Sequence, residues 1–206
     1  MTEMQMLRRF VFIVERPLVP EFFLLLQQGV VIRFRLSCSV AAFLREELRA
    51  GEDTVAKIQS IILDGKAVDD IETALVKDGS VLALSAAMPG LVGATLRRGG
   101  AYSSFRNAIT YHEEAGTCGQ KEGSVRIKIF NLLMAEMGPG LLQRGVCLKA
   151  EDLSKFIAGL STDFWKGCRR IELDNKPVDV RELMDSAWLA AGGEVLLSVS
   201  AAKAEA

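Results

Sequence analysis

The chain has 206 residues, of which half are hydrophobic and a quarter are charged, and its formal net charge is −1. This composition excludes an intrinsically disordered chain, because the apolar content is high and the charges balance. With 25 basic residues, 26 acidic residues and one histidine, the chain lacks the positive field of a typical nucleic-acid-binding protein and offers little for histidine-dependent catalysis.

The N-terminal segment has none of the marks of a targeting signal. The apolar run Phe10–Val14 is broken by Glu15, Arg16 and Pro17, whereas a secretory signal needs about 7–15 uninterrupted apolar residues. The next apolar run, Phe22–Leu26, is far shorter than the roughly 20 residues of a membrane span. The four cysteines form no C-x-x-C pair, which favours buried thiols over disulfides or a zinc site. We therefore expect a soluble cytoplasmic protein that binds no membrane.

Paired strands are expected at the start of each half of the chain. In the segment 30–36, residues 32–36 alternate between apolar and basic side chains, which is the period of a half-buried strand. The apolar segment 10–15 precedes them, and Gly29 stands directly before residue 30. Segments 125–130 and 145–149 repeat this arrangement in the second half. We expect each pair of segments to form a hairpin.

A helix is expected after each of these pairs. Apolar residues recur there at the spacing of one helix face. These residues are Val40, Phe43, Leu44 and Leu48 in the first half and Leu153, Phe156, Ile157 and Leu160 in the second half.

An internal repeat organises the chain. Segment Ile61–Asp69 matches segment Ile171–Asp179 at six of nine positions, at a constant offset of 110 residues. The dipeptides Asp64-Gly65 and Asp174-Asn175 are typical of two-residue hairpin turns. A turn glycine and an apolar strand follow in both halves, at residues 79–87 and 193–202. We therefore predict a duplicated module that occupies residues 8–88 and 124–203, with a connector at residues 89–123.

These segments resemble the β-grasp (ubiquitin-like) fold, and within it the group of the molybdopterin-synthase small subunit and the thiamine sulfur carrier. The residues that carry the resemblance are the turn Leu63-Asp64-Gly65-Lys66 and the approach to the last strand, Leu75–Val81. The resemblance implies an α+β fold of two tandem β-grasp modules, each a mixed sheet with one packed helix, joined by a Gly-rich connector. It also implies a C-terminal Gly-Gly, whereas this sequence ends in Ala-Ala-Lys-Ala-Glu-Ala. We therefore expect that the second module is not an ordinary sulfur carrier.

The connector has an unusual charge pattern. From Gly79 to His112, thirty-four residues include no Asp or Glu. Arginines beside glycine amides form a suitable site for an anion. The candidate residues for binding a ligand or partner are Arg97, Arg98, Gly99, Gly100 and Arg106.

Each functional interpretation of the connector has a structural alternative. The string Leu96–Gly100 looks like a ubiquitin tail, but we favour a short helix that starts near Pro89, ends with Arg97 and Arg98 and is capped by Gly99. The alternative to an anion site is a linker with solvated arginines that packs back onto the modules through the apolar side chains of Leu91, Val92, Leu96 and Phe105.

One local cluster contains groups able to act as metal ligands or catalysts. It comprises His112, Glu113, Glu114 and Cys118. The cluster lacks the second histidine of an H-E-x-x-H zinc site, and the chain has no other histidine. We therefore interpret it as a surface loop and predict no catalytic residue, metal ligand or cofactor.

The function predicted from these observations is non-catalytic. We expect a protein that binds a protein partner or a small anionic ligand and does not bind nucleic acid. The alternative is a sulfur-carrier-like protein that acts in cofactor sulfur transfer. Such a protein could be processed at the internal Gly99-Gly100.

Overall fold

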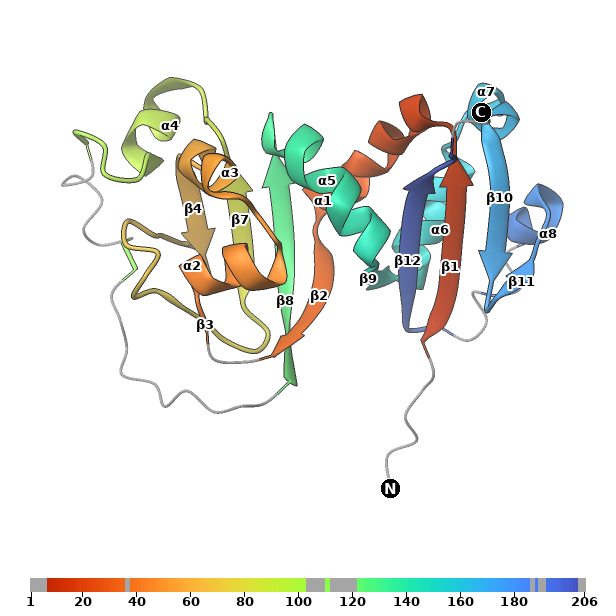
Figure 1. Cartoon of the computed structure of the whole chain (residues 1–206), viewed down its shortest axis with the longest axis horizontal. Helices are drawn as coiled ribbons and strands as arrows, with labels where there is room; N and C mark the ends of the chain where they lie inside the picture. Colours follow the sequence, from red (N-terminus) through yellow and green to blue (C-terminus); the bar gives the residue numbers. More distant parts are fainter. Residues whose placement is uncertain are drawn as a thin grey trace. The chain divides into compact units, whose positions relative to one another are not determined.

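The computed structural model describes residues 7–35, 38–102, 110–111, 122–185, 188 and 192–203. The chain is α+β and divides into two compact units (Figure 1). Unit 1 comprises Met1–Leu25 and Pro139–Ala206, and unit 2 comprises Leu26–Gly138. No helix in the described part of the chain is long and apolar enough to cross a membrane.

Each half of the chain contributes strands and helices. The elements of the first half are β1 (Arg8–Val14), η1 (Arg16–Phe22), α1 (Phe23–Gln28), β2 (Val30–Arg35), β3 (Cys38–Ser39), α2 (Val40–Ala42), η2 (Phe43–Glu47), α3 (Glu52–Lys57), β4 (Ser60–Leu63), β5 (Lys66–Ala67), β6 (Leu75–Val76), β7 (Val81–Ser85) and α4 (Gly90–Leu96). The elements of the second half are β8 (Glu122–Phe130), α5 (Leu133–Arg144), β9 (Val146–Lys149), α6 (Ala150–Ala158), α7 (Thr162–Lys166), β10 (Cys168–Leu173), β11 (Lys176–Pro177), α8 (Val180–Met184) and β12 (Glu194–Ala201).

Five of the strands in unit 2 are hydrogen-bonded in the order β2-β8-β7-β4-β5. Strand β8 is antiparallel to β2 and parallel to β7, while β4 is antiparallel to both β7 and β5. Strands β3 and β6 form a separate antiparallel pair. All these strands belong to the first half of the chain except β8, the green strand between β2 and β7 in Figure 1.

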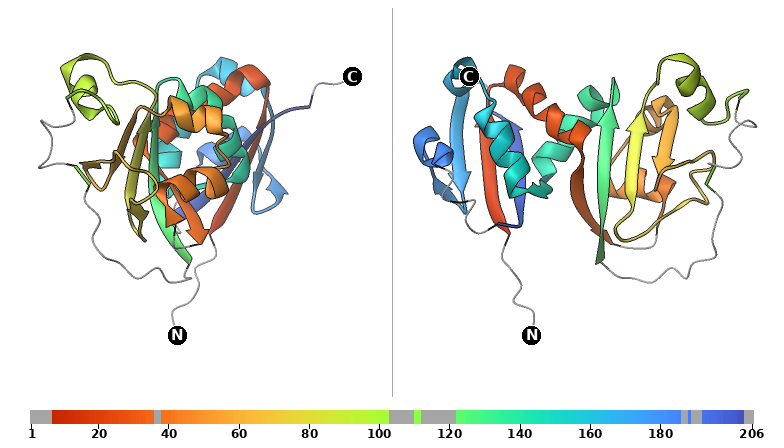
Figure 2. Two further views of the ribbon diagram at one scale, coloured as in Figure 1. Left: turned by 60° about the vertical axis from the view of Figure 1, so that its left-hand side comes forward. Right: turned by 180° about the vertical axis from the view of Figure 1, so that it is seen from behind.

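Unit 1 is built mainly from the second half of the chain, and its strands are in the order β11-β10-β1-β12-β9. Strand β1 is antiparallel to β10 and parallel to β12, and β12 is antiparallel to β9. Four of these strands come from the second half, whereas β1 comes from the first half. Both views in Figure 2 show the red β1 among the blue strands.

The two expected hairpins are therefore wrong. Strand β1 pairs with β10 and β12, and β2 pairs with β8. A hairpin needs a short turn, but fifteen residues separate β1 from β2, and they fold into η1 and α1. The corresponding fifteen residues between β8 and β9 contain helix α5. These helical connections carry the chain away from the preceding strand.

The compact units also differ from the predicted modules at residues 8–88 and 124–203. The first strand of each predicted module lies in the unit that is built mainly from the other module. Alternation of apolar side chains determines which face of a strand is buried, but it does not determine the neighbouring strand. In a chain with an internal repeat, two similar strands can satisfy the same position.

The predicted turns are present in both units. Asp64 and Gly65 have φ values of 50° and 80°, and Asp174 and Asn175 have φ values of 53° and 65°. Each dipeptide joins two antiparallel strands, with Leu63 opposite Lys66 in the first half and an equivalent register in the second. Positive φ at both central residues is the signature of a type I′ turn.

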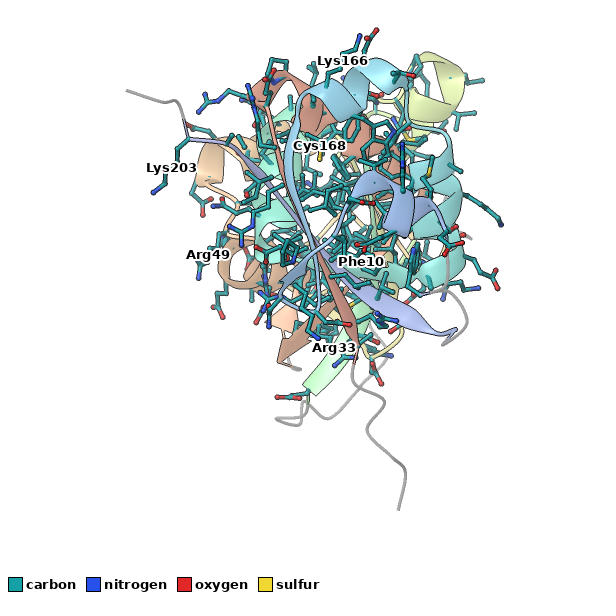
Figure 3. The ribbon with its side chains drawn as sticks, turned by 90° about the vertical axis from the view of Figure 1, so that its right-hand side faces the viewer. Phe10, Arg33, Arg49, Lys166, Cys168 and Lys203 are labelled. Atoms are coloured by element: carbon teal, nitrogen blue, oxygen red, sulfur yellow. The ribbon has the colours of Figure 1, made fainter. Side chains whose placement is uncertain are left out.

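Strand β1 supplies much of the core of unit 1. The side chains of Phe10, Phe12 and Val14 are fully buried, and Figure 3 labels Phe10 among the packed side chains. The ring of Phe10 lies 4.8 Å from that of Trp188, centroid to centroid. The ring of Phe12 lies 5.5 Å from that of Phe22. Strand β1 is thus paired on both sides, with β10 and β12, and packed into the core through aromatic contacts.

Strand β8 has the same role in unit 2. Its residues Val125, Ile127 and Ile129 are fully buried and alternate with less buried positions. They share the core of unit 2 with the buried side chains of β4 and β7, namely Ile61, Leu63, Leu82 and Leu84. The alternation predicted for residues 125–129 is confirmed.

Candidate functional site

The first part of the connector is helix α4, which begins after Pro89 and ends before Arg97. The short helix expected to start near Pro89 is confirmed, but its C-terminal cap is Arg97 in an extended conformation, so Arg98 lies beyond the helix and Gly99 does not cap it. Gly93 is buried, and a Cβ atom at that position would lie 1.7 Å from the carbonyl oxygen of Met88. Only glycine permits this close approach.

The apolar side chains of α4 do not follow the packing expected of a linker. Leu91 and Val92 are 74% and 64% exposed, whereas Leu96 is half-buried. Phe105 lies outside the described residues. The helix therefore packs through its small residues and its C-terminal end, and it exposes two large apolar side chains.

The segment after α4 is tied to unit 2 by backbone hydrogen bonds. The N–H of Arg98 donates to the carbonyl oxygen of Gln59 at 2.7 Å. The N–H of Gly99, which has a φ of 61°, donates to Oδ1 of Asp69 at 3.0 Å. The N–H of Gly100 donates to the carbonyl oxygen of Arg97 at 3.1 Å. Gly99-Gly100 is thus part of a hydrogen-bonded turn.

Asp69 changes the expected role of Gly99. The sequence suggests that the Gly99 amide could approach an anionic ligand, but a carboxylate of the chain itself already accepts its hydrogen bond. This contact also brings a negative charge to a segment that contains no acidic residue of its own. The side chain of Arg98 is therefore the stronger candidate for an external anion.

Arg98 is half-buried, and its Nη1 atom is fully buried without a hydrogen-bond partner. The described residues contain two other buried side-chain atoms without a partner, Oε1 of Gln59 and Oγ of Ser60. Ser60 is only 2% exposed. The carbonyl oxygen of Gln59 accepts the backbone N–H of Arg98, and Ser60 follows Gln59 in the chain, so the three residues are neighbours through the backbone. We call Gln59, Ser60 and Arg98 the Arg98 cluster.

The other predicted site residues are less informative. Arg97 is exposed, and Arg106 lies outside the described residues. The described chain returns at Thr110, which forms a parallel bridge with Ala67. The N–H of Tyr111 donates to the carbonyl oxygen of Ala67 at 2.8 Å. The two described parts of the connector thus contact neighbouring elements, β4 and β5.

The sequence offers one candidate loop for catalysis or metal binding. His112, Glu113, Glu114 and Cys118 lie outside the described residues. Among the residues that the structure does describe, no group of three or more His, Cys, Asp or Glu side chains is arranged to hold a metal ion.

Sequence reasoning identified Arg98 but missed Gln59 and Ser60. The only local signal for these two residues is their polarity directly before the apolar run Ile61–Leu63. That signal is weak, because polar residues commonly begin a strand. Their relation to Arg98 depends on the return of the connector to β4.

Comparison with protein-family models, with curated proteins and with solved structures finds no match for this chain. The functional argument therefore depends on the residues and contacts described above.

Proposed function

We propose that this chain is a non-catalytic protein of two β-grasp modules that binds a small oxyanion beside Arg98. The observation that carries the proposal is the buried Nη1 atom of Arg98, which has no hydrogen-bond partner. A buried charged donor without a partner is costly in free energy. A carboxylate or phosphate oxygen is the natural partner for a guanidinium nitrogen.

The neighbouring residues indicate the chemistry of the ligand. Oε1 of Gln59 can only accept a hydrogen bond, whereas the hydroxyl of Ser60 can donate or accept one. A monohydrogen phosphate carries acceptor oxygens for Arg98 and a hydroxyl group that can donate to Gln59. Inorganic phosphate is therefore the appropriate probe. A buried water molecule is the competing occupant, since it also needs several polar partners.

The composition of unit 2 supports the β-grasp part of the proposal. Unit 2 contains an antiparallel pair, β2 and β8, a helical segment, α2–η2, and the returning strands β4 and β7, which are the kinds of element that a β-grasp module requires. Strand β8 takes the place that the sequence assigns to β1. Unit 1 contains the equivalent strands, but its two central strands, β1 and β12, occur in the opposite order.

The test is calorimetric titration of the full chain with inorganic phosphate at low ionic strength. We expect saturable binding that Arg98→Gln weakens by at least about tenfold, because a hydrogen bond to a charged group is lost. The combined change of Arg97, Arg98 and Arg106 to Ala should abolish it. Arg33→Gln is the matched control, because Arg33 is an exposed arginine on strand β2.

Two results would overturn the proposal. One is the absence of saturable phosphate binding by the unmodified chain, which would leave water as the occupant. The other is equal affinity of the unmodified chain and Arg98→Gln, with both proteins folded by circular dichroism. A protein partner and a cytoplasmic location stay predictions.

The second candidate function is that of a sulfur-carrier-like protein processed after Gly100. It is favoured by the exposure of Gly99 at the surface. Release of this segment would break the hydrogen bonds from Arg98 to Gln59 and from Gly99 to Asp69. Intact-mass measurement of the protein from its native cell tests this candidate. A species that ends at Gly100 would support it, and full-length protein alone would contradict it.

A further inference from the structure

The exchange of strands between the two halves of the chain has a consequence for binding. Unit 1 obtains an interior strand, β1, from the first half, and unit 2 obtains an interior strand, β8, from the second half. In each half, two strands leave room for a third strand between them, and a strand of the other half occupies this place. In unit 1 this position lies between β10 and β12, and in unit 2 it lies between β2 and β7.

An aspartate of the second half holds the start of β1. Oδ1 of Asp174 accepts the N–H of Arg9 at 2.8 Å, and Oδ2 accepts Nε of Arg8 at 3.0 Å. The N–H of Asp174 donates to the carbonyl oxygen of Arg9 at 2.8 Å. Asp174 thus forms two hydrogen bonds with the backbone of Arg9 and one ion pair with Arg8. The hydrogen bonds fix the register of β1, and the ion pair favours a basic residue at its start.

The same arrangement exists within the first half. The N–H of Asp64, the repeat equivalent of Asp174, donates to the carbonyl oxygen of Val81, and its Oδ1 accepts the N–H of Val81 at 2.7 Å. Asp64 thus holds a strand of its own half, whereas Asp174 holds a strand of the other half. In both halves, the aspartate at this turn forms hydrogen bonds with the backbone of the strand next to its own.

An aspartate of the first half holds the start of β8. Oδ1 of Asp78 accepts the N–H of Ser124 at 2.8 Å and the hydroxyl of Ser124 at 3.1 Å. The N–H of Gly79 donates to the carbonyl oxygen of Ser124 at 2.8 Å. Both exchanged strands are thus anchored at their start by a carboxylate of the opposite half and are buried along their apolar face.

We propose that the two halves of this chain are binding partners of each other, so that a chain cut in the connector remains a tight complex of two polypeptides. The interaction surface is the position between two strands in each unit. Its occupant is an apolar β-strand whose first residues meet an aspartate. Phe10, Phe12 and Val14 supply the buried side chains in unit 1, and Val125, Ile127 and Ile129 supply them in unit 2. This proposal is independent of anion binding at Arg98.

The test uses the full chain with a specific protease site inserted after Tyr102. The protein is folded, cleaved and analysed by native mass spectrometry and size-exclusion chromatography. We expect both fragments to elute together at the mass of the uncut protein, also after dilution to nanomolar concentration. Separate elution of the two fragments would overturn the proposal.

Variants of the cleavable protein distinguish strand exchange from other association. Phe12→Ala removes a fully buried side chain from β1, and we expect it to raise the dissociation constant of the two fragments by about 100-fold or more. Ile13→Ala, at the adjacent half-buried position, is the control and should have a much smaller effect. Equal effects of the two changes, or no effect of Phe12→Ala, would contradict the assigned interface. Circular dichroism of the uncut variants verifies that both fold.

Discussion

Asp69 is the residue that most directly limits the proposed anion site. Its carboxylate accepts the N–H of Gly99, next to Arg98. A negative charge at this position opposes the approach of an external anion, since like charges repel over several ångströms even in partly screened surroundings. The same contact fixes the turn that carries Arg98. The residue therefore has two separable effects, one through its charge and one through its hydrogen bond.

The change Asp69→Asn separates these effects. Asparagine keeps an oxygen that can accept the hydrogen bond of Gly99 but removes the charge. We expect the affinity for phosphate to rise several-fold at low salt, and the gain to shrink as salt is added, because screening reduces the repulsion. Phosphate titrations at two ionic strengths measure this difference. Unchanged affinity at low salt would show that Asp69 does not compete with the ligand.

We expect the same substitution to have opposite effects on stability at two glycines that lie in helices. Gly140 lies exposed in α5, and a Cβ atom there would meet nothing within 4 Å. Gly140→Ala should therefore raise the free energy of unfolding by about 0.5–1 kcal/mol. Gly93→Ala should lower it by about 1–3 kcal/mol, because the added carbon would collide with the backbone of Met88. Urea unfolding of both variants tests the pair, and a shift in the same direction would contradict this explanation.

At the scale of elements, the predicted strands and turns are largely confirmed, whereas their pairing is not. The alternation in 125–129 and the turn dipeptides depend on local side-chain chemistry, so the sequence contains the necessary information. The neighbour of β1 depends on contacts with residues more than 150 positions away. The helical connection between β1 and β2 was also overlooked, although its apolar run Phe22–Leu26 is visible in the sequence.

In the candidate site, too, the features with local sequence signals are predictable, whereas those that depend on contacts between distant residues are not. The arginines and the short helix follow from the connector sequence, because charge, proline and glycine are local signals. The position of the Arg98 cluster depends on the return of the connector to Gln59, and the contact of Gly99 with Asp69 spans thirty positions. Such contacts leave no local trace.

The contact between Asp78 and the start of strand β8 predicts that the stability of the protein depends on pH. Hydrogen bonds from the backbone and hydroxyl of Ser124 hold the pKa of Asp78 below its usual value. A carboxylate with a lowered pKa in the folded state stabilises that state above its unfolded pKa, and the stabilisation is lost as the pH falls through the folded value. Asp78→Asn should thus be less stable than the unmodified chain near pH 7. The difference should shrink progressively below about pH 4.

Urea unfolding as a function of pH measures this effect. Ser124→Ala is the matched variant, because it removes the hydroxyl donor but keeps the backbone donor to Asp78. The pH-dependent difference between Asp78→Asn and the parent should become smaller in the Ser124→Ala background. A difference that stays constant down to about pH 2 would exclude Asp78 as its source.

At the scale of the whole molecule, strand exchange makes each half of the chain incomplete. A chain limited to residues 1–102 would lack β8, so β2 and β7 would each present an unpaired edge and the apolar face of the core would lose three buried side chains. A chain limited to residues 122–206 would lack β1, with the same consequence for β10 and β12. Unpaired interior strands favour aggregation or disorder.

We therefore expect each half, expressed alone, to show little cooperative unfolding and a poorly dispersed amide NMR spectrum. Mixing the two halves in denaturant and refolding them together should restore the spectrum of the intact chain, because each half then receives its missing strand. Cooperative unfolding of either half alone would show that it can close its sheet without the other. That result would favour consecutive modules with the boundaries predicted from the repeat over the exchanged arrangement.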